Sequence, residues 1–417
     1  MTEEQMDVIE EHYFILKTMT DEMHNESPGS EDMYNPLMNY FRLMDEGMKQ
    51  NYPIVWHFLT VSQEPLRAMD VTVISPEYLA GVMAILGTAE KYIDLPIDSL
   101  HEHMCVLNRF PVGLAISGDT VMPDMVIYGP NPCDAGLTTY SNLEHRFRDI
   151  PFYCADIPTK ANDRGIKYMS GQLKEMVRSV ENNLNIRMDL DRLRELIERS
   201  NQAFAIQKKL LDFQKLTPCP TPSFYHIMHG YANFGLPGVP EVLSWYERQY
   251  DWMTKRIEAG ENAVPKENLR LAWIANNIDF DLGIYDWLED EYGVVSVVCA
   301  MSLLDTDSID TKDEDTIFEG LAKRTLHYPM PRNGRAVADE YIERSIAIAE
   351  EYKADAIVFA ANTGCKYHWA TAQLVRDAIM DRTGLPVLSF ECSPWDERVL
   401  STNGIKEKFT RFLDTIL

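Results

Sequence analysis

Short, mainly hydrophobic runs alternate along this chain with longer segments of helical periodicity. The clearest run, Ala356–Ala361, has the length and composition typical of a strand buried on both faces of a parallel sheet. The other predicted strands are Ile54–Leu59, Val71–Ile74, Asp124–Tyr128, Pro151–Cys154, Leu269–Ala275, Val294–Ala300 and Pro386–Glu391. Because helical segments separate the runs, the pattern predicts an α/β fold with doubly wound parallel sheets.

A long helical stretch divides these strands into two groups. Residues 167–215 have a helical pattern that is interrupted near 185–190, where Asp189 is placed to cap the second helix. We therefore expect an N-terminal helical segment (1–50), a first Rossmann-like domain (51–165), a helical connector (166–217) and a second Rossmann-like domain (218–417). A cleft between two such domains is a common place for a ligand.

Length, composition and charge narrow the class of protein. A chain of 417 residues favours two or three domains, and a net charge of -26 argues against binding to nucleic-acid phosphates. No apolar run reaches the ~18 residues that span a bilayer, so no membrane contact is expected. The acidic start lacks the pattern of a secretion signal, which predicts a cytoplasmic protein.

The seven cysteines are an odd number and are scattered, which favours thiols or metal ligands over a disulfide framework. Cys365 follows the run Ala356–Ala361 and an Asn-Thr-Gly turn, and Cys133 follows the run that ends at Tyr128. We expect Cys105 to flank a similar turn. Ligands bind at the carboxyl ends of parallel strands, and three thiolates there can hold an iron–sulfur cluster with one iron open. Taken one by one, the same residues are also typical of buried, inert thiols.

The remaining cysteines and the histidines are given other roles. Cys392 also follows a strand and is a candidate fourth or substitute ligand, whereas Cys154, Cys219 and Cys299 are interpreted as structural. The pairs His101 and His103, and His226 and His229, lack a third zinc ligand, so we interpret them as surface or hydrogen-bonded side chains. Neither GxGxxG after a strand nor GxxxxGK[ST] occurs, so any ATP that the chemistry needs would be bound by another protein.

Several segments, taken in order, resemble the 2-hydroxyacyl-CoA dehydratase and benzoyl-CoA reductase family. The resemblance runs from about Asn51 to the C-terminus and rests on order and separation more than on any single motif. The segments are Glu64–Asp70, Cys105 with Arg109, Cys133-Asp134, Asn185–Leu196, Gly364–Lys366, and Asp396–Arg398 before a final amphipathic helix. The Cys-Asp pair continues as Ala135–Thr138, where the family often has a basic or aromatic helix.

This resemblance implies a [4Fe-4S] cluster held by Cys105, Cys133 and Cys365, with Glu64 near the substrate carbonyl as a catalytic carboxylate. Glu64 is equally typical of a first-turn helix carboxylate that the helix dipole stabilises. It implies a paralogous second subunit or a second copy, an acyl-CoA substrate, and a separate ATP-dependent iron–sulfur activator that supplies one low-potential electron. In the dehydratases that electron reduces the thioester carbonyl of a 2-hydroxyacyl-CoA to a ketyl radical, and hydroxide then leaves from C2. In the reductases electrons enter an aromatic ring.

Three hypotheses follow. The first is a subunit of a radical 2-hydroxyacyl-CoA dehydratase, and the second is a reductase subunit of the benzoyl-CoA reductase type or one acting on a non-CoA substrate. The third is a cluster-free α/β ligand-binding protein with structural cysteines. Iron and sulfide content separates the third from the other two, and acyl-CoA binding tests for a CoA-ester substrate.

Overall fold

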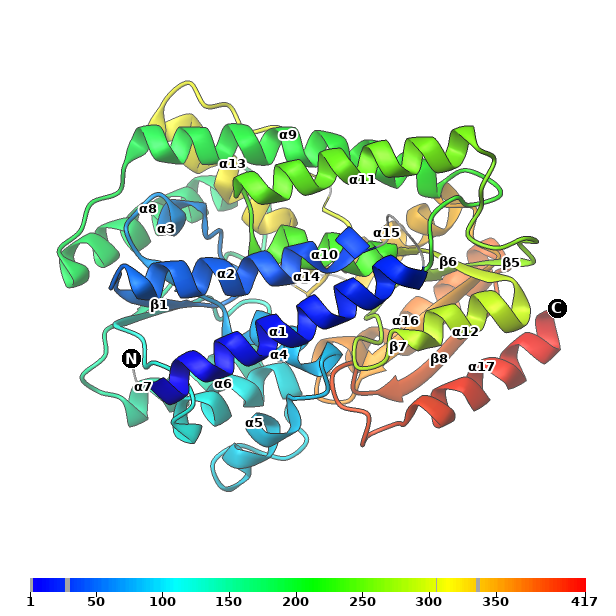
Figure 1. Ribbon diagram of the computed structural model, residues 1–417, viewed down its shortest axis with the longest axis horizontal. Helices are drawn as coiled ribbons and strands as arrows, with labels where there is room; N and C mark the ends of the chain where they lie inside the picture. Colours follow the sequence, from blue (N-terminus) through cyan, green and yellow to red (C-terminus); the bar gives the residue numbers. More distant parts are fainter. Residues whose placement is uncertain (1–2, 27–30, 305, 335–337) are drawn as a thin grey trace.

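The protein contains two four-stranded parallel sheets, which lie at opposite ends of the molecule (Figure 1). A computed structural model describes residues 3–26, 31–304, 306–334 and 338–417. The strand order is β2-β1-β3-β4 in the first sheet and β6-β5-β7-β8 in the second. The predicted α/β fold with two Rossmann-like parallel sheets is therefore confirmed.

All eight strands coincide with predicted hydrophobic runs to within two residues at either end. The first sheet consists of β1 (Ile54–His57), β2 (Thr72–Ile74), β3 (Met125–Tyr128) and β4 (Phe152–Cys154). The second consists of β5 (Leu269–Trp273), β6 (Val294–Cys299), β7 (Ala356–Asn362) and β8 (Val387–Cys392). Every residue of the central strands β1, β3, β5 and β7 is buried, which explains why those runs are mainly apolar.

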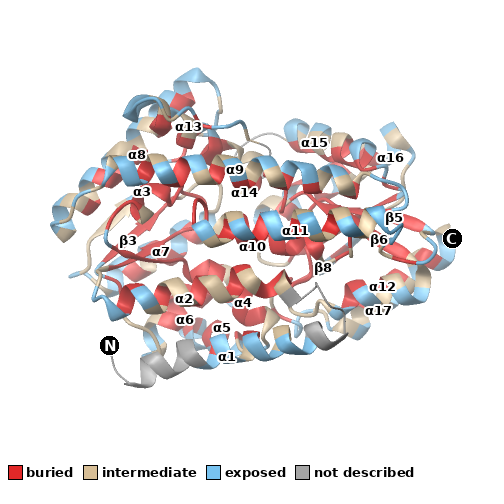
Figure 2. Cartoon of the chain, turned by 45° about the horizontal axis from the view of Figure 1, so that its top comes forward, coloured by how far each residue is buried: buried red, intermediate tan, exposed pale blue. Residues whose placement is uncertain are grey.

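Helices cover both sheets and bury their apolar faces against them, so that red and blue alternate along the outer helices in Figure 2. Those in the first half are α1 (Glu3–Glu26), η1 (Glu31–Tyr34), α2 (Asn35–Lys49), α3 (Glu64–Arg67), α4 (Pro76–Ile85), α5 (Glu90–Asp94), η2 (Leu95–Asp98), α6 (Val106–Ser117) and α7 (Asp134–Arg146). Those in the second half are α10 (Tyr225–Gly235), α11 (Pro240–Glu258), α12 (Gly283–Tyr292), α13 (Glu314–His327), α14 (Pro329–Gly334), α15 (Ala338–Glu351), α16 (Lys366–Thr383) and α17 (Thr402–Ile416).

The helical connector is formed by α8 (Asp163–Leu184) and α9 (Leu190–Gln214). Asp189 caps α9, because its carboxylate accepts from the backbone N–H groups of Asp191 and Arg192. Asn185 ends α8 with a positive φ of 53°, a conformation that asparagine tolerates better than most residues. The predicted interruption and cap are both confirmed, and α9 packs along α11 from one end of the molecule toward the other (Figure 1).

One helix from the second half of the chain packs on the first sheet. The side chains of Phe318 and Leu321 in α13 lie in one hydrophobic cluster with Val55 of β1 and Ile127 of β3. In Figure 1, α13 lies beside α8 at the first-sheet end. The chain thus crosses back after β6, and the predicted boundary at residue 218 separates the two sheets but not the two cores.

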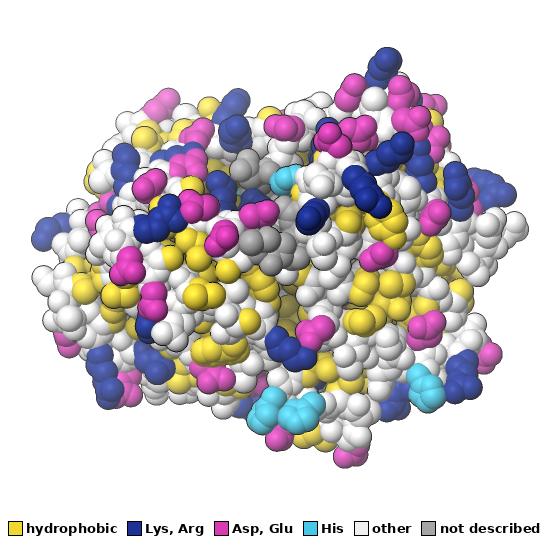
Figure 3. Space-filling view, turned by 180° about the vertical axis from the view of Figure 1, so that it is seen from behind, with side chains coloured by type: hydrophobic (Ala, Val, Ile, Leu, Met, Phe, Trp, Pro, Cys, Tyr) yellow, Lys and Arg dark blue, Asp and Glu magenta, His cyan; other side chains and the backbone are white. Residues whose placement is uncertain are grey.

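The surface carries acidic and basic side chains over the whole face that Figure 3 shows, without one basic patch. Among the described residues, no helix is both long enough and apolar enough to cross a membrane.

Candidate functional site

A large pocket lies where the two sheets direct their carboxyl ends. Residues that follow seven of the eight strands line it, all strands except β4. Its empty volume, including the part open to solvent, is about 1490 Å³. The carboxyl ends of parallel strands are where α/β proteins bind ligands, and here two sheets contribute such ends to one site.

Apolar and polar side chains share the lining of this pocket. The apolar side chains include Phe58, Leu59, Leu107, Ile227, Phe234, Met301 and Met330. The polar and thiol side chains include Thr60, Glu77, Cys105, Asn108, Cys133, Asn276, Asn277, Asp279, Ser302, Asn362, Cys365 and His368. A few polar groups in a mainly apolar wall are typical of a site that binds and orients a small molecule.

Three cysteines line the pocket, and each occupies the N-cap position of a helix. Cys105 precedes α6, Cys133 precedes α7 and Cys365 precedes α16. The Cys133 sulfur accepts a hydrogen bond from the backbone N–H of Gly136 at 3.2 Å. Because the first N–H groups and the dipole of a helix favour a negative charge, all three positions suit a thiolate.

Close backbone contact brings the Cys105 and Cys365 segments together. A Cβ atom on Gly364 would lie 2.1 Å from the backbone nitrogen of Cys105 and 2.4 Å from its Cα. Only glycine fits at this point, so the residue before Cys365 allows the two loops to touch.

An ion pair links the Cys133 and Cys365 segments. The Lys366 ammonium, directly after Cys365, contacts the carboxylate of Asp134, directly after Cys133. Both side chains are exposed, so this pair contributes little to stability. Its significance is geometric, because it joins a helix of the first half to a helix of the second.

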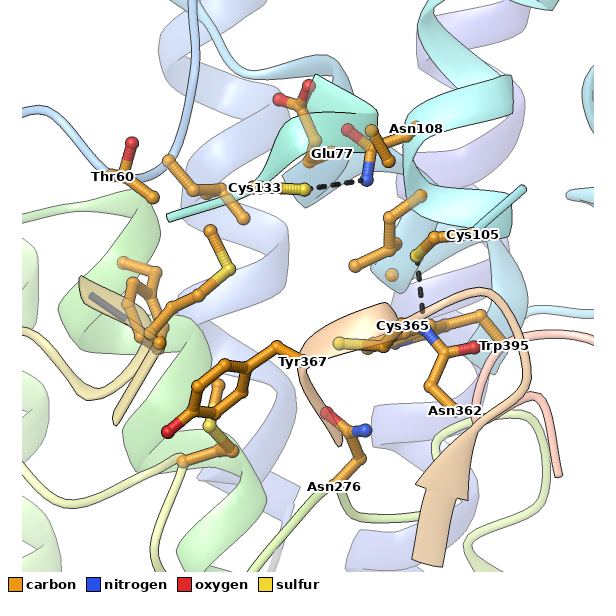
Figure 4. A pocket seen from close by; sticks show the side chains of 18 of the residues that line it. Thr60, Glu77, Cys105, Asn108, Cys133, Asn276, Asn362, Cys365, Tyr367 and Trp395 are labelled. Atoms are coloured by element: carbon orange, nitrogen blue, oxygen red, sulfur yellow. Dashed lines mark hydrogen bonds between the residues drawn. The ribbon is translucent and has the colours of Figure 1, made fainter. Parts of the chain in front are cut away.

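Two asparagine side chains donate hydrogen bonds to the cysteine sulfurs (Figure 4). The Nδ2 of Asn362 lies 3.0 Å from the Sγ of Cys105, and the Nδ2 of Asn108 lies 3.5 Å from the Sγ of Cys133. Figure 4 also shows that the three cysteines surround one open space. Hydrogen bonds to sulfur orient thiolate ligands and tune the metal groups that they hold.

Burial keeps these thiols protonated when no positive group is bound. Burial, together with a smaller effect of nearby Cys105, raises the pKa of Cys133 to about 12 and that of Cys365 to about 11. Burial also raises the pKa of Cys105, although the hydrogen bond from Asn362 opposes the shift. Within the described parts of the chain, no three His, Cys, Asp or Glu side chains are grouped to hold a metal ion.

The other cysteines lie outside the pocket lining. The expectation that Cys105 follows a strand was wrong, because its segment comes after α5 and η2 and begins α6. Cys392 is fully buried in the core at the end of β8 and does not line the pocket, so the structure does not support it as a ligand. Cys219 and Cys299 are buried as expected, whereas Cys154 is exposed.

Glu64 is also absent from the pocket lining. Its carboxylate is completely buried and lies 2.7 Å from the Arg324 guanidinium of α13, which also donates to Ser200 of α9 at 2.9 Å. The structure therefore separates Glu64 from the cysteines and places it in an ion pair that joins helices.

Sequence reasoning missed two carboxyl groups that do line the pocket, Glu77 and Asp279. Burial raises the pKa of Glu77 to about 8, although its carboxyl accepts a 2.6 Å hydrogen bond from Tyr140. Asn276, Asn277 and Asp279 follow the predicted strand Leu269–Ala275 directly. The rule that ligands bind after the carboxyl ends of parallel strands, which selected Cys365, would therefore have selected this segment too.

The histidines mostly follow expectation. His101 and His103 are exposed, and the Nε2 of His226 lies 3.1 Å from Asn277 Oδ1. His229 differs, because it is buried among aromatic rings and neither ring nitrogen has a hydrogen-bond partner in the described part of the chain.

Together the fold and the site define a class of protein: two parallel α/β sheets whose carboxyl ends form one pocket with three helix-capping thiols. Sequence comparison then gives the family. The model of the family described as 2-hydroxyglutaryl-CoA dehydratase, D-component, matches residues 58–416, and the chain belongs to this family. This finding confirms the resemblance that the motifs indicated.

A curated relative carries a related name. The chain is 23% identical over 155 residues to (R)-2-hydroxyglutaryl-CoA dehydratase, subunit alpha, of Acidaminococcus fermentans. The alignment covers 36% of this chain and 32% of that subunit, so it spans about a third of the relative.

Proposed function

We propose that this chain is the iron–sulfur subunit of a 2-hydroxyacyl-CoA dehydratase and that Cys105, Cys133 and Cys365 hold a [4Fe-4S] cluster. The observation that carries the proposal is the convergence of three helix-capping thiols, 260 positions apart at the extremes, on one pocket. The matched family and the relative both carry dehydratase names, so the dehydratase is preferred to the reductase.

The residues fit the group. Three thiols set around an open space, instead of converging on one point, suit a four-iron cluster, because the cluster separates its ligands by its own width. Helix N-termini and the amides of Asn108 and Asn362 favour the thiolate form. Binding of the cluster to the three cysteines would release the protons that burial keeps on their sulfur atoms.

The cluster, when bound, would supply one-electron chemistry and an iron that is open to an oxygen atom of the substrate. The chain's own residues have other tasks. Apolar side chains such as Phe58, Phe234 and Met330 would exclude water around the reacting acyl group. Polar side chains at the strand ends, such as Asn276 and Ser302, would orient the thioester and the hydroxyl group.

The proposal includes partner proteins. The curated relative is named as an alpha subunit, which supports a second subunit, either a paralogue or a second copy. An ATP-dependent iron–sulfur activator would deliver the electron, since the sequence contains no Walker A loop of its own.

Iron and sulfide analysis of protein purified without oxygen tests this proposal. We expect roughly four irons per chain and a broad absorption band near ~400 nm that air bleaches. Cys105→Ser, Cys133→Ser and Cys365→Ser should each lose the cluster, whereas Cys299→Ser, a buried thiol outside the pocket, should keep it. Full iron in any of the first three variants would refute that ligand, and iron-free protein after reconstitution would refute the cluster.

Binding of acyl-CoA is the second part of the test. The protein with its partner subunit should convert a 2-hydroxyacyl-CoA, starting with (R)-2-hydroxyglutaryl-CoA, into the enoyl-CoA when an electron donor is supplied. A cluster-containing protein that binds no CoA ester would contradict the dehydratase proposal but not the cluster.

A further inference from the structure

The pocket contains a carboxylate that is held on one side only. Asp279 follows β5, is 7% exposed and lines the same pocket as the three cysteines. Its Oδ2 accepts hydrogen bonds from the Tyr231 hydroxyl at 2.9 Å and from the Trp395 indole N–H at 2.8 Å. Its backbone N–H donates to the carbonyl of Pro394 at 2.9 Å, so backbone and side chain are both fixed.

The other carboxylate oxygen, Oδ1, is buried and has no hydrogen-bond partner among the described residues. Leaving a buried acceptor without a donor lowers the stability of the fold, and a charged acceptor lowers it more. Two donors therefore orient one oxygen of Asp279, while no group of the described chain donates to the second. This arrangement is the one that a general base requires: a positioned acceptor whose partner atoms leave its reactive oxygen free.

We propose that Asp279 is the general base that removes the C3 proton of the 2-hydroxyacyl group, an inference that rests on the proposed function. Oδ1 takes the proton, and the C3–H electron pair becomes the new C2–C3 double bond. The C2–O bond breaks and its electron pair leaves with hydroxide, which receives the proton from Asp279 and becomes water. The electron supplied by the activator is returned, so the elimination is redox-neutral and the carboxylate is restored.

Glu77, the other carboxyl group in this pocket, is less suited to the task. Its Oε1 accepts from the Tyr140 hydroxyl at 2.6 Å and its Oε2 from Ser75 at 3.4 Å, so both oxygens already have donors. Asp279 is thus the carboxyl group of the described pocket residues that combines two orienting donors with a free oxygen.

The titration of Asp279 is compatible with this role. Burial raises its pKa to about 6, so that it is ionised at neutral pH and yet more basic than an ordinary carboxylate. Tyr231, Tyr285 and Cys299, which interact electrostatically with Asp279, remain neutral near pH 6. The pKa of Tyr231 and that of Tyr285 lie well above 10, and that of Cys299 is about 12.

The test compares three variants with wild type, each purified anaerobically with the partner subunit and assayed on a 2-hydroxyacyl-CoA that wild type dehydrates. Asp279→Asn removes the base. Tyr231→Phe removes one donor to its carboxylate. Tyr246→Phe is the matched control, since this buried tyrosine donates to Asn233 at 2.9 Å and does not line the pocket.

We expect Asp279→Asn to keep its iron and to bind substrate within about threefold of wild type, while kcat falls about 10²–10⁴-fold. A primary isotope effect with C3-deuterated substrate should increase. Tyr231→Phe should move the acid limb of the kcat–pH profile to higher pH, because the carboxylate loses a stabilising donor. Tyr246→Phe should leave that limb in place.

The inference is overturned if iron-replete Asp279→Asn turns over within about tenfold of wild type. If Asp279→Asn loses iron or does not fold, Tyr231→Phe decides: a shifted acid limb supports the inference, and a limb unmoved like that of Tyr246→Phe overturns it. If wild-type protein carries the cluster but dehydrates no 2-hydroxyacyl-CoA, the proposed function itself is refuted. If wild type and Asp279→Asn are both active, the proposed function stands and only the role of Asp279 is refuted.

Discussion

Gly364 shows how one residue without a side chain helps to form the site. Its missing Cβ lets the turn after β7 touch the backbone of Cys105, which belongs to the other half of the chain. The cysteines themselves were visible in the sequence, but this contact was not, since nothing in the local pattern tells which distant loop a glycine faces.

Gly364→Ala should therefore lower the iron content although it removes no ligand. The added methyl group would lie 2.1 Å from the Cys105 nitrogen, so the two cysteine segments must separate. Gly171→Ala is the control, because Gly171 lies in α8 and its added Cβ would meet no atom of another described segment within 4 Å. Iron analysis of both proteins decides, and equal iron in Gly364→Ala and wild type would contradict the packing argument.

His229 is a second residue whose setting the sequence did not reveal. It is buried between the rings of Tyr225, Trp245 and Tyr246, and burial lowers its pKa to about 3. In the unfolded chain its pKa is about 6.5. The folded protein thus keeps His229 neutral. Below pH 6.5 the unfolded chain takes up a proton that the folded chain does not, so the free energy of unfolding decreases as the pH falls from 6.5 toward 3.

His229→Phe should be at least as stable as wild type at pH 7.5, since it removes an unsatisfied buried polar group. Its advantage should grow by about 1.4 kcal/mol for each pH unit below 6.5, reaching about 2 kcal/mol at pH 5. Urea unfolding at the two pH values measures this difference, with the exposed His103→Phe as control. An advantage that is the same at both pH values would show that His229 is not held neutral.

Among the elements, α13 has the least expected position, because it follows β6 and yet packs on the first sheet. A buried ion pair fixes it there: Arg324 of α13 binds Glu64 of α3, with relative exposures of 1% and 0%. The hydrophobic pattern predicted neither this helix nor its partner, since an amphipathic face can pack against any apolar surface of suitable shape.

Glu64→Gln should destabilise the protein by about 3–5 kcal/mol, because it leaves the Arg324 charge buried without its counterion. Asp315→Asn is the matched control, as Asp315 pairs with Lys174 and also joins α13 to α8, but on the surface. That variant should lose less than about 1 kcal/mol. Denaturant unfolding separates the two cases, and a stable Glu64→Gln protein without turnover would instead support the catalytic role expected from the family resemblance.

At the scale of the whole molecule, the three cysteines connect the two halves of the chain. Cys105 and Cys133 come from the first half and Cys365 from the second, so a bound cluster would cross-link both. Any group that binds the folded state alone stabilises it by mass action.

We therefore expect protein with its cluster to unfold at a higher temperature than the same protein after anaerobic removal of iron. A shift of several degrees corresponds to a few kcal/mol for a chain of this size. Differential scanning calorimetry of both forms, with Cys299→Ser as a variant that keeps the cluster, provides the measurement. Identical transitions would mean that the cluster does not bridge the halves.

The sequence by itself determined the elements: eight apolar runs became eight strands, and Asp189 capped the helix that it was expected to cap. These features depend on neighbours along the chain, where periodicity and capping act. The rule that ligands bind after the carboxyl ends of strands found Cys133 and Cys365, which do follow strands. It also selected Cys105, although Cys105 follows helical segments and not a strand.

Tertiary structure alone decided which distant groups meet. It placed Asp279 between Tyr231 and Trp395, removed Glu64 from the pocket to pair with Arg324, and buried Cys392 in the core. The physical reason is that strand order, helix packing and close loop contacts depend on surfaces far apart in sequence. A local pattern can predict that a side chain stands at a strand end, but only the folded chain determines what lies opposite it.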